Sequence, residues 1–215
     1  AAASLPLGFG RVDGALNLVA ILSPRSGENW FVGHDGRWLG TYVPALFRAF
    51  PFRLGRAATR NELVLCAADG QAGGPGSEPV YEPSGAFSPR VKSLASFLIT
   101  FEKSRRQTEK AASALEEAGV LAPWPLRLRD HAGAEIVMEG MLRTDEVALS
   151  ELDDERFLEL RRCGALGIAY AQLLSIQRID MLEQLARIAS FLKSETARSG
   201  PASEFLHQSD DNLVF

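Results

Sequence analysis

Few side chains in this sequence have the type and spacing that catalysis or metal binding requires. Its three histidines, His34, His131 and His207, lie far from one another along the chain. A serine or cysteine nucleophile needs a histidine and a carboxylate beside it, and no Gly-x-Ser-x-Gly segment occurs. His34 and His131 sit among turn-forming residues, and His207 with the nearby Asp210 and Asp211 is more typical of a solvated tail than of a metal site. We therefore expect no catalytic residue, no metal and no cofactor.

The two cysteines and the first glycines offer no alternative chemistry. Cys66 and Cys163 are too far apart in the sequence for a Cys-x-x-Cys motif or a metal knuckle. Both have apolar neighbours, which predicts buried free thiols. Gly8 and Gly10 are not followed by the third glycine and the helix pattern of a dinucleotide-binding fingerprint.

Residues suited to recognition are concentrated in one stretch, residues 27–54. The candidate ligand-binding residues are Trp30, Arg37, Trp38, Tyr42 and Arg48. Their arginines can form forked hydrogen bonds to carboxylates or hydroxyls, and their aromatic rings offer flat faces that stack on sugars or on peptide aromatics. This predicts a surface for a small carbohydrate or peptide ligand. The alternative interpretation places the aromatic rings in the core and uses the arginines to bridge a helix to a sheet.

A hairpin and a short helix would have to position these five residues. Residues 29–32 and 37–39 are rich in strand-forming types, and the segment between them is typical of a tight turn. Pro44 suits the first turn of a helix that Pro51 ends. The other strands predicted in this half are residues 5–9, 16–22, 52–57 and 62–67. We expect these strands to form one antiparallel sheet that carries the helix.

The second half of the chain is predicted to be mainly helical. Ser88 and Pro89 begin a long helix that ends at Gly119. Its charged middle is either a solvated face or the contact for a protein partner or a second copy of the chain. A hairpin is predicted at residues 124–129 and 135–138, and amphipathic helices follow it.

These patterns predict four parts and one fold class. The parts are a β-rich part at 1–68, a Gly/Pro-rich linker or flap at 69–87, a helix, hairpin and C-terminal helices on the same core at 88–199, and a tail at 200–215. The predicted class is α+β, with an antiparallel sheet, a long central helix and a helical C-terminal half.

Composition excludes some classes of partner. The 215 residues are 46% hydrophobic, which suffices for a core, and the net charge of −4 argues against nucleic acid binding. Apolar runs are too short for a membrane span.

The chain begins at Ala1-Ala2-Ala3-Ser4 without a methionine, so we expect a fragment or a processed start. The expected location is the cytoplasm, or the envelope if a leader is missing.

Two segments resemble a known family. GENWFVGHDGRWLGTYVPALFRAFPF and the later LDDERFLELRRCGALGIAYAQLLSIQRIDMLEQL are similar to the corresponding segments of the bacterial SapC family. The resemblance covers about residues 5–195; family members have further residues before the position of Ala1, and the tail beyond Arg198 has no counterpart. It implies a non-enzymatic binding or accessory protein for surface-layer assembly or nutrient transport at the envelope, working through protein partners. It supplies no catalytic residue, and an enzyme acting on a small molecule or peptide near the first hairpin remains the alternative.

Overall fold

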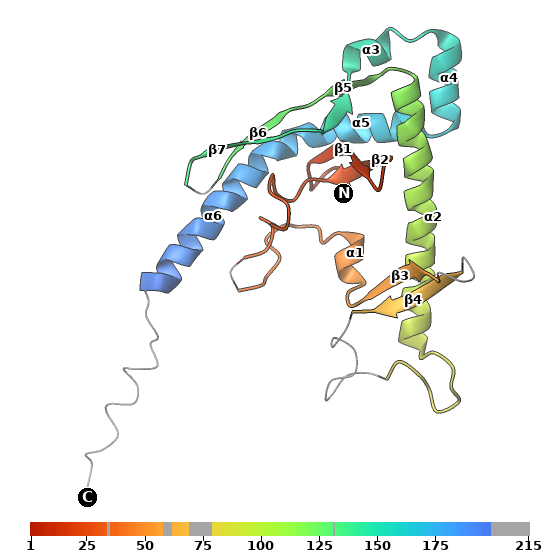
Figure 1. Ribbon diagram of the computed structural model, residues 1–215, viewed down its shortest axis with the longest axis vertical. Helices are drawn as coiled ribbons and strands as arrows, with labels where there is room; N and C mark the ends of the chain where they lie inside the picture. The colour runs from red at the N-terminus through yellow and green to blue at the C-terminus, as the bar shows by residue number, and fades with distance from the viewer. Residues whose placement is uncertain (34, 58–61, 69–78, 131, 199–215) are drawn as a thin grey trace, which may run out of the picture.

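The computed structural model describes residues 1–33, 35–57, 62–68, 79–130 and 132–198 (Figure 1). Antiparallel sheets, a long helix and a helical C-terminal part confirm the predicted α+β class. All three histidines lie outside the described residues, as do residues 69–78 of the predicted linker and the predicted tail at 200–215. The predictions for those residues therefore stay predictions, as does the division into four parts.

The largest sheet has four strands in the order β2-β1-β8-β5. Its hairpin joins β1 (Leu7–Val12) to β2 (Ala15–Ala20) through Asp13 and Gly14, whose φ angles of 52° and 81° suit a two-residue turn. The other two strands are β5 (Leu121–Pro123) and β8 (Leu142–Thr144), from far along the chain. The sheet therefore depends on pairing that is remote in sequence.

Two separate hairpins complete the β structure: β3 (Phe52–Arg56) with β4 (Leu63–Ala67), and β6 (Leu126–Arg129) with β7 (Glu135–Met138). The expectation of a single sheet in the N-terminal half was wrong. Both edges of β1 are occupied, one by β2 and the other by β8. The β3–β4 hairpin packs instead on the long helix α2 (Pro89–Glu117).

The predicted first hairpin also differs, because its strands shorten to one isolated bridge between Val32 and Trp38. Asn29 bends the chain before it: its Oδ1 accepts a hydrogen bond from Phe31 N at 3.0 Å, and its carbonyl accepts one from Val32 N at 3.2 Å. Such local bonds compete with an extended ladder. The predicted helix after Pro44 is present as α1 (Ala45–Arg48).

The longer helices lie around the four-stranded sheet (Figure 1). In Figure 1, α2 stands along one side, α5 (Ala165–Ser175) crosses above β1 and β2, and α6 (Ile179–Arg198) descends on the other side. The remaining helices are α3 (Glu146–Ser150), α4 (Asp154–Arg162) and the 3₁₀ turn η1 (Ile176–Arg178). Gly164, at φ 79°, separates α4 from α5.

Two apolar clusters hold these elements together. One joins β1 and β2 to the C-terminal half of α2 and to α5 around Phe9, Leu115 and Ala169. The other joins the N-terminal segment to β6 and α6 around Leu5, Phe31 and Leu182. The short helix α1 contributes no residue within its own span to either cluster.

Candidate functional site

The segment around α1 presents aromatic rings and an arginine at the protein surface. We call Trp38, Tyr42, Phe47, Arg48 and Phe97 the arginine–aromatic surface. Pro44 is the N-cap of α1, and Ala49, only 1% exposed, follows the helix and attaches it to the body of the protein. A helix of four residues is not stable alone. Tertiary contacts must therefore hold it in place.

Trp38 connects this surface to the core. Its ring stacks on the fully buried Phe31, with centroids 5.1 Å apart and planes 15° apart, and meets Phe47 at 5.7 Å and 56°. Aromatic pairs of this kind are worth about 0.5–1.5 kcal/mol beyond the area they bury. Since Phe31 already stacks on the Trp38 ring, the ring has less face to offer a ligand than the sequence suggests.

Arg48 lies between two rings from different elements. Its guanidinium carbon is 5.8 Å from the centroid of Tyr42 and 5.7 Å from that of Phe97, which belongs to α2. Cation–π contacts at exposed sites contribute about 0.5–1 kcal/mol each. Within the described residues the Arg48 guanidinium makes no hydrogen bond and no ion pair, although Arg48 is exposed.

Next to these contacts, α1 and the residue before β3 expose large apolar side chains. Leu46 is 54% exposed, Phe47 46% and Phe50 65%. Scattered exposed apolar residues are ordinary. Three exposed apolar side chains in α1 and just after it, beside the exposed ring of Phe97 on α2, indicate a contact surface. The same stretch is basic: residues 36–57 contain four arginines and no aspartate, glutamate or lysine.

The structure brings together three of the five predicted ligand-binding residues. Trp38, Tyr42 and Arg48 belong to the surface just described. Trp30 is 9% exposed in the core, where its Nε1 donates to Glu28 Oε2 at 3.0 Å. Arg37 is exposed and pairs with Asp35 at 3.3 Å. No ligand is present, so the ligand-binding prediction for the five stays a prediction.

Sequence reasoning missed Phe47 and Phe97. Phe97 lies beside Leu98 of the apolar stripe of α2 but is 37% exposed, whereas Leu98 is 2% exposed. A large apolar residue outside the helix stripe was the available signal. Its proximity to Arg48 could not be read from the sequence, because the two residues belong to different elements.

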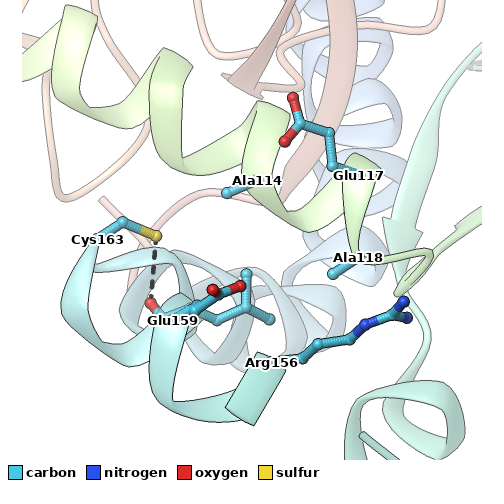
Figure 2. Close-up of a pocket in the computed structure, with 7 residues that line it drawn as sticks. Ala114, Glu117, Ala118, Arg156, Glu159 and Cys163 are labelled. Carbon is cyan, nitrogen blue, oxygen red and sulfur yellow. Dashed lines mark hydrogen bonds between the residues drawn. The ribbon is translucent and has the colours of Figure 1, made fainter.

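Cys163 corrects another prediction. A groove of about 330 Å³ lies between α2 and α4, lined by Ala114, Ala118, Leu160 and charged side chains (Figure 2). Cys163 lines it as an exposed free thiol, not a buried one, and its Sγ donates to Leu160 O at 3.4 Å; Cys66 is half-buried. Cys163 ends α4 at the surface, so its apolar neighbours in sequence did not imply burial. Figure 2 shows the guanidinium of Arg156 pointing away from the sulfur.

Ion pairs explain the pKa shifts of the carboxylates. Arg105 Nε, 2.8 Å from Glu102 Oε2, lowers the pKa of Glu102 to about 2 despite partial burial, and Arg106 adds to the effect. Arg25, at 2.8 Å, holds the pKa of the 6%-exposed Asp130 below its usual range, helped by the backbone N–H groups of Ala134 and Ala132. Both groups are held ionised, which suits structural roles.

Sequence similarity assigns this chain to a family, although its described residues offer no metal site. Among the described residues, no group of histidine, cysteine and carboxylate side chains could hold a metal ion, and no helix is long and apolar enough to cross a membrane. Neither the curated proteins nor the solved structures contain a match. The SapC family model, by contrast, matches residues 1–182. The chain therefore belongs to the SapC family.

Proposed function

We propose that this protein is a non-enzymatic accessory protein for surface-layer assembly or envelope nutrient transport, and that it binds a protein partner through the arginine–aromatic surface. The observation that supports the proposal is the exposure of Leu46, Phe47 and Phe50 around a helix that contributes nothing to the core within its own span. A surface of this kind gains stability when a partner covers it.

The long helix contributes to the same surface. Phe97 on α2 is 37% exposed, and its ring contacts the Arg48 guanidinium. The expectation of a partner or a second copy on the long helix therefore becomes more specific. We place the contact on the N-terminal half of α2, beside α1, and not on the charged middle of α2, where Arg105 is paired with Glu102 and Glu109.

Site-specific photo-cross-linking in cells of the native organism tests the proposal. A benzophenone amino acid replaces Phe50, which is 65% exposed, and in a matched control it replaces Val147, which is 64% exposed on α3. Cells are separated into cytoplasmic and envelope fractions after irradiation, and adducts are identified by mass spectrometry. The location of the adduct also tests whether the protein acts in the cytoplasm or at the envelope.

We expect position 50 to give one reproducible adduct, with a surface-layer subunit, an uptake protein or a second copy of the chain. The control at position 147 should not give that adduct. Equal labelling at both positions would mean that no surface is selected. A protein without an adduct at position 50 that instead retains a small molecule in native mass spectrometry would contradict the accessory role and favour the enzyme alternative.

A further inference from the structure

We propose that Arg48 is a carboxylate receptor, and that the arginine–aromatic surface docks a peptide segment carrying an aspartate or glutamate beside a large apolar side chain. This inference rests on the proposed function, because it specifies the chemistry of the protein partner. It concerns one guanidinium, its two flanking rings and the exposed side chains of α1.

The geometry of Arg48 prepares it for a planar anion. The rings of Tyr42 and Phe97 contact the guanidinium at 5.8 and 5.7 Å, and these contacts limit its motion before any ligand binds. No carboxylate among the described residues pairs with it, so its N–H donors are not used within the part of the protein that the structure describes. An ordered guanidinium loses less entropy when it forms a bidentate pair with a carboxylate.

Charge complementarity specifies the partner. The whole chain has a net charge of −4, yet residues 36–57 carry four positive charges and no negative one. The arginines of this stretch are Arg37, Arg48, Arg53 and Arg56. Arg37 pairs with Asp35 at 3.3 Å, whereas Arg48 and Arg53 form no ion pair with the described residues. An acidic partner is therefore attracted to this face and repelled by the acidic remainder of the surface.

The apolar neighbours of Arg48 specify the rest of the ligand. Leu46, Phe47 and Phe50 are each about half exposed or more. A free acid would leave these side chains in water, whereas an apolar residue next to the acidic one in a peptide would cover them. Burial of one large apolar side chain strengthens binding by about tenfold or more. The surface therefore fits a peptide better than a small anion.

An anionic membrane is the other partner that arginines and aromatic rings can attract. Attraction to a lipid surface depends on the number of positive charges near it, and each arginine contributes to a similar extent. A bidentate pair with a carboxylate depends instead on one planar guanidinium. Substitutions of Arg48 and Arg53 therefore separate the two partners, because both arginines are exposed but only Arg48 lies between two rings.

The test is a selection of short random peptides displayed on phage, performed on the full chain and on Arg48→Gln, Arg48→Lys and Arg53→Gln. Circular dichroism of each variant confirms that the fold is retained. Calorimetry then measures the affinity of a selected peptide and of its Asp→Asn or Glu→Gln counterpart. Flotation with phosphatidylglycerol vesicles, and with phosphatidylcholine vesicles as a control, measures lipid binding of the same four proteins.

We expect selected peptides to share an acidic residue next to a large apolar one. Arg48→Gln should weaken their binding at least about tenfold, the value for a charge-assisted hydrogen bond. Arg48→Lys should weaken it nearly as much because the fork is lost, and Arg53→Gln by less than about threefold. Neutralising the acidic residue of the peptide should reproduce the loss seen with Arg48→Gln.

Three results would overturn the inference: no enriched acidic motif, equal losses for Arg48→Gln and Arg53→Gln, or flotation with the anionic vesicles that survives Arg48→Lys. The third would identify a membrane as the partner. A specific adduct at position 50 without an acidic motif would refute only the carboxylate receptor. An acidic motif without any adduct in cells would refute only the accessory role.

Discussion

Gln172 provides the sharpest test of how this fold is held together. β1 pairs with β8 at one position, Phe9 with Leu142. Continuing that antiparallel register would pair Gly8 with Arg143 and then Leu7 with Thr144, but the strands pair at neither position. The Gln172 side chain, 0% exposed on α5, bridges them instead: Oε1 accepts from Thr144 N at 2.9 Å and Nε2 donates to Leu7 O at 3.3 Å.

Replacing Gln172 with Met keeps the side-chain length and removes both hydrogen bonds. Thr144 N then loses its partner, and Leu7 O keeps only the longer hydrogen bond from Ser175 Oγ at 3.5 Å. A buried backbone group left unpaired costs about 1–3 kcal/mol. Water cannot replace the amide at a site that is 0% exposed without opening the contact between α5 and the sheet. The better burial of an apolar Met side chain offsets part of the loss. We expect the free energy of unfolding to fall by about 2 kcal/mol.

Urea denaturation followed by circular dichroism measures this change. At a typical slope of about 2–3 kcal/mol per molar urea, the midpoint should fall by about 1 M. Gln107→Met is the matched control, because Gln107 is exposed on α2; it should change stability by less than about 0.5 kcal/mol. A loss below about 1 kcal/mol for Gln172→Met, or equal losses for the two variants, would refute the bridging role.

Three more predictions concern other parts of the chain. Glu102→Gln should remove the part of stability that wild type loses as pH falls from about 4.5 to about 2, because Arg105 lowers the folded-state pKa of Glu102; acid unfolding curves that superpose would contradict this. Gly40→Ala should lower the stability measured by thermal unfolding by about 1–3 kcal/mol, because the added Cβ would lie 2.9 Å from Trp38 Nε1. Its control is Gly167→Ala in α5, where the added Cβ meets open space; this variant should stabilise the protein by about 0.5–1 kcal/mol. A thiol reagent should modify exposed Cys163 in the native protein, and Cys163→Ser should abolish the fast phase of the labelling; a fast phase that persists in the variant would contradict the placement of this thiol.

For Glu102 the effect should stay below about 1 kcal/mol, because the pair with Arg105 is at the surface. The contribution of the Glu102–Arg105 pair to the free energy of unfolding is complete above the unfolded-state pKa of Glu102. It disappears at lower pH, as the Glu102 carboxylate is protonated in the folded protein. Measurement in high salt provides a control, since screening should reduce the difference between wild type and variant.

The elements of this fold could largely be predicted because their signals are local. Asp13-Gly14 specifies a hairpin turn, and Pro89 begins α2 as expected. Val91, Leu98 and Leu115 lie on the apolar stripe of this helix and are buried, as helical spacing requires. In each case a few neighbouring residues carry the preference, and tertiary packing does not oppose it.

The recognition residues were predictable only as residue types. The sequence singled out Trp38, Tyr42 and Arg48, but it equally suggested Trp30, which the structure places in the core. Alternation along a strand says which residues share a face, not which face the core covers. Asn29 further disrupted the expected hairpin by bonding its own backbone neighbours.

The sequence by itself determined the class of fold, most elements and, through two recognisable segments, the family. Only the tertiary structure decided that β8 pairs with β1, that the Gln172 amide bridges Leu7 and Thr144, and that Phe97 and Tyr42 contact the Arg48 guanidinium. The reason is physical: turns and helix ends are specified by neighbours in the chain. Sheet edges and surface contacts are instead settled by competition among segments that meet only after the chain has packed.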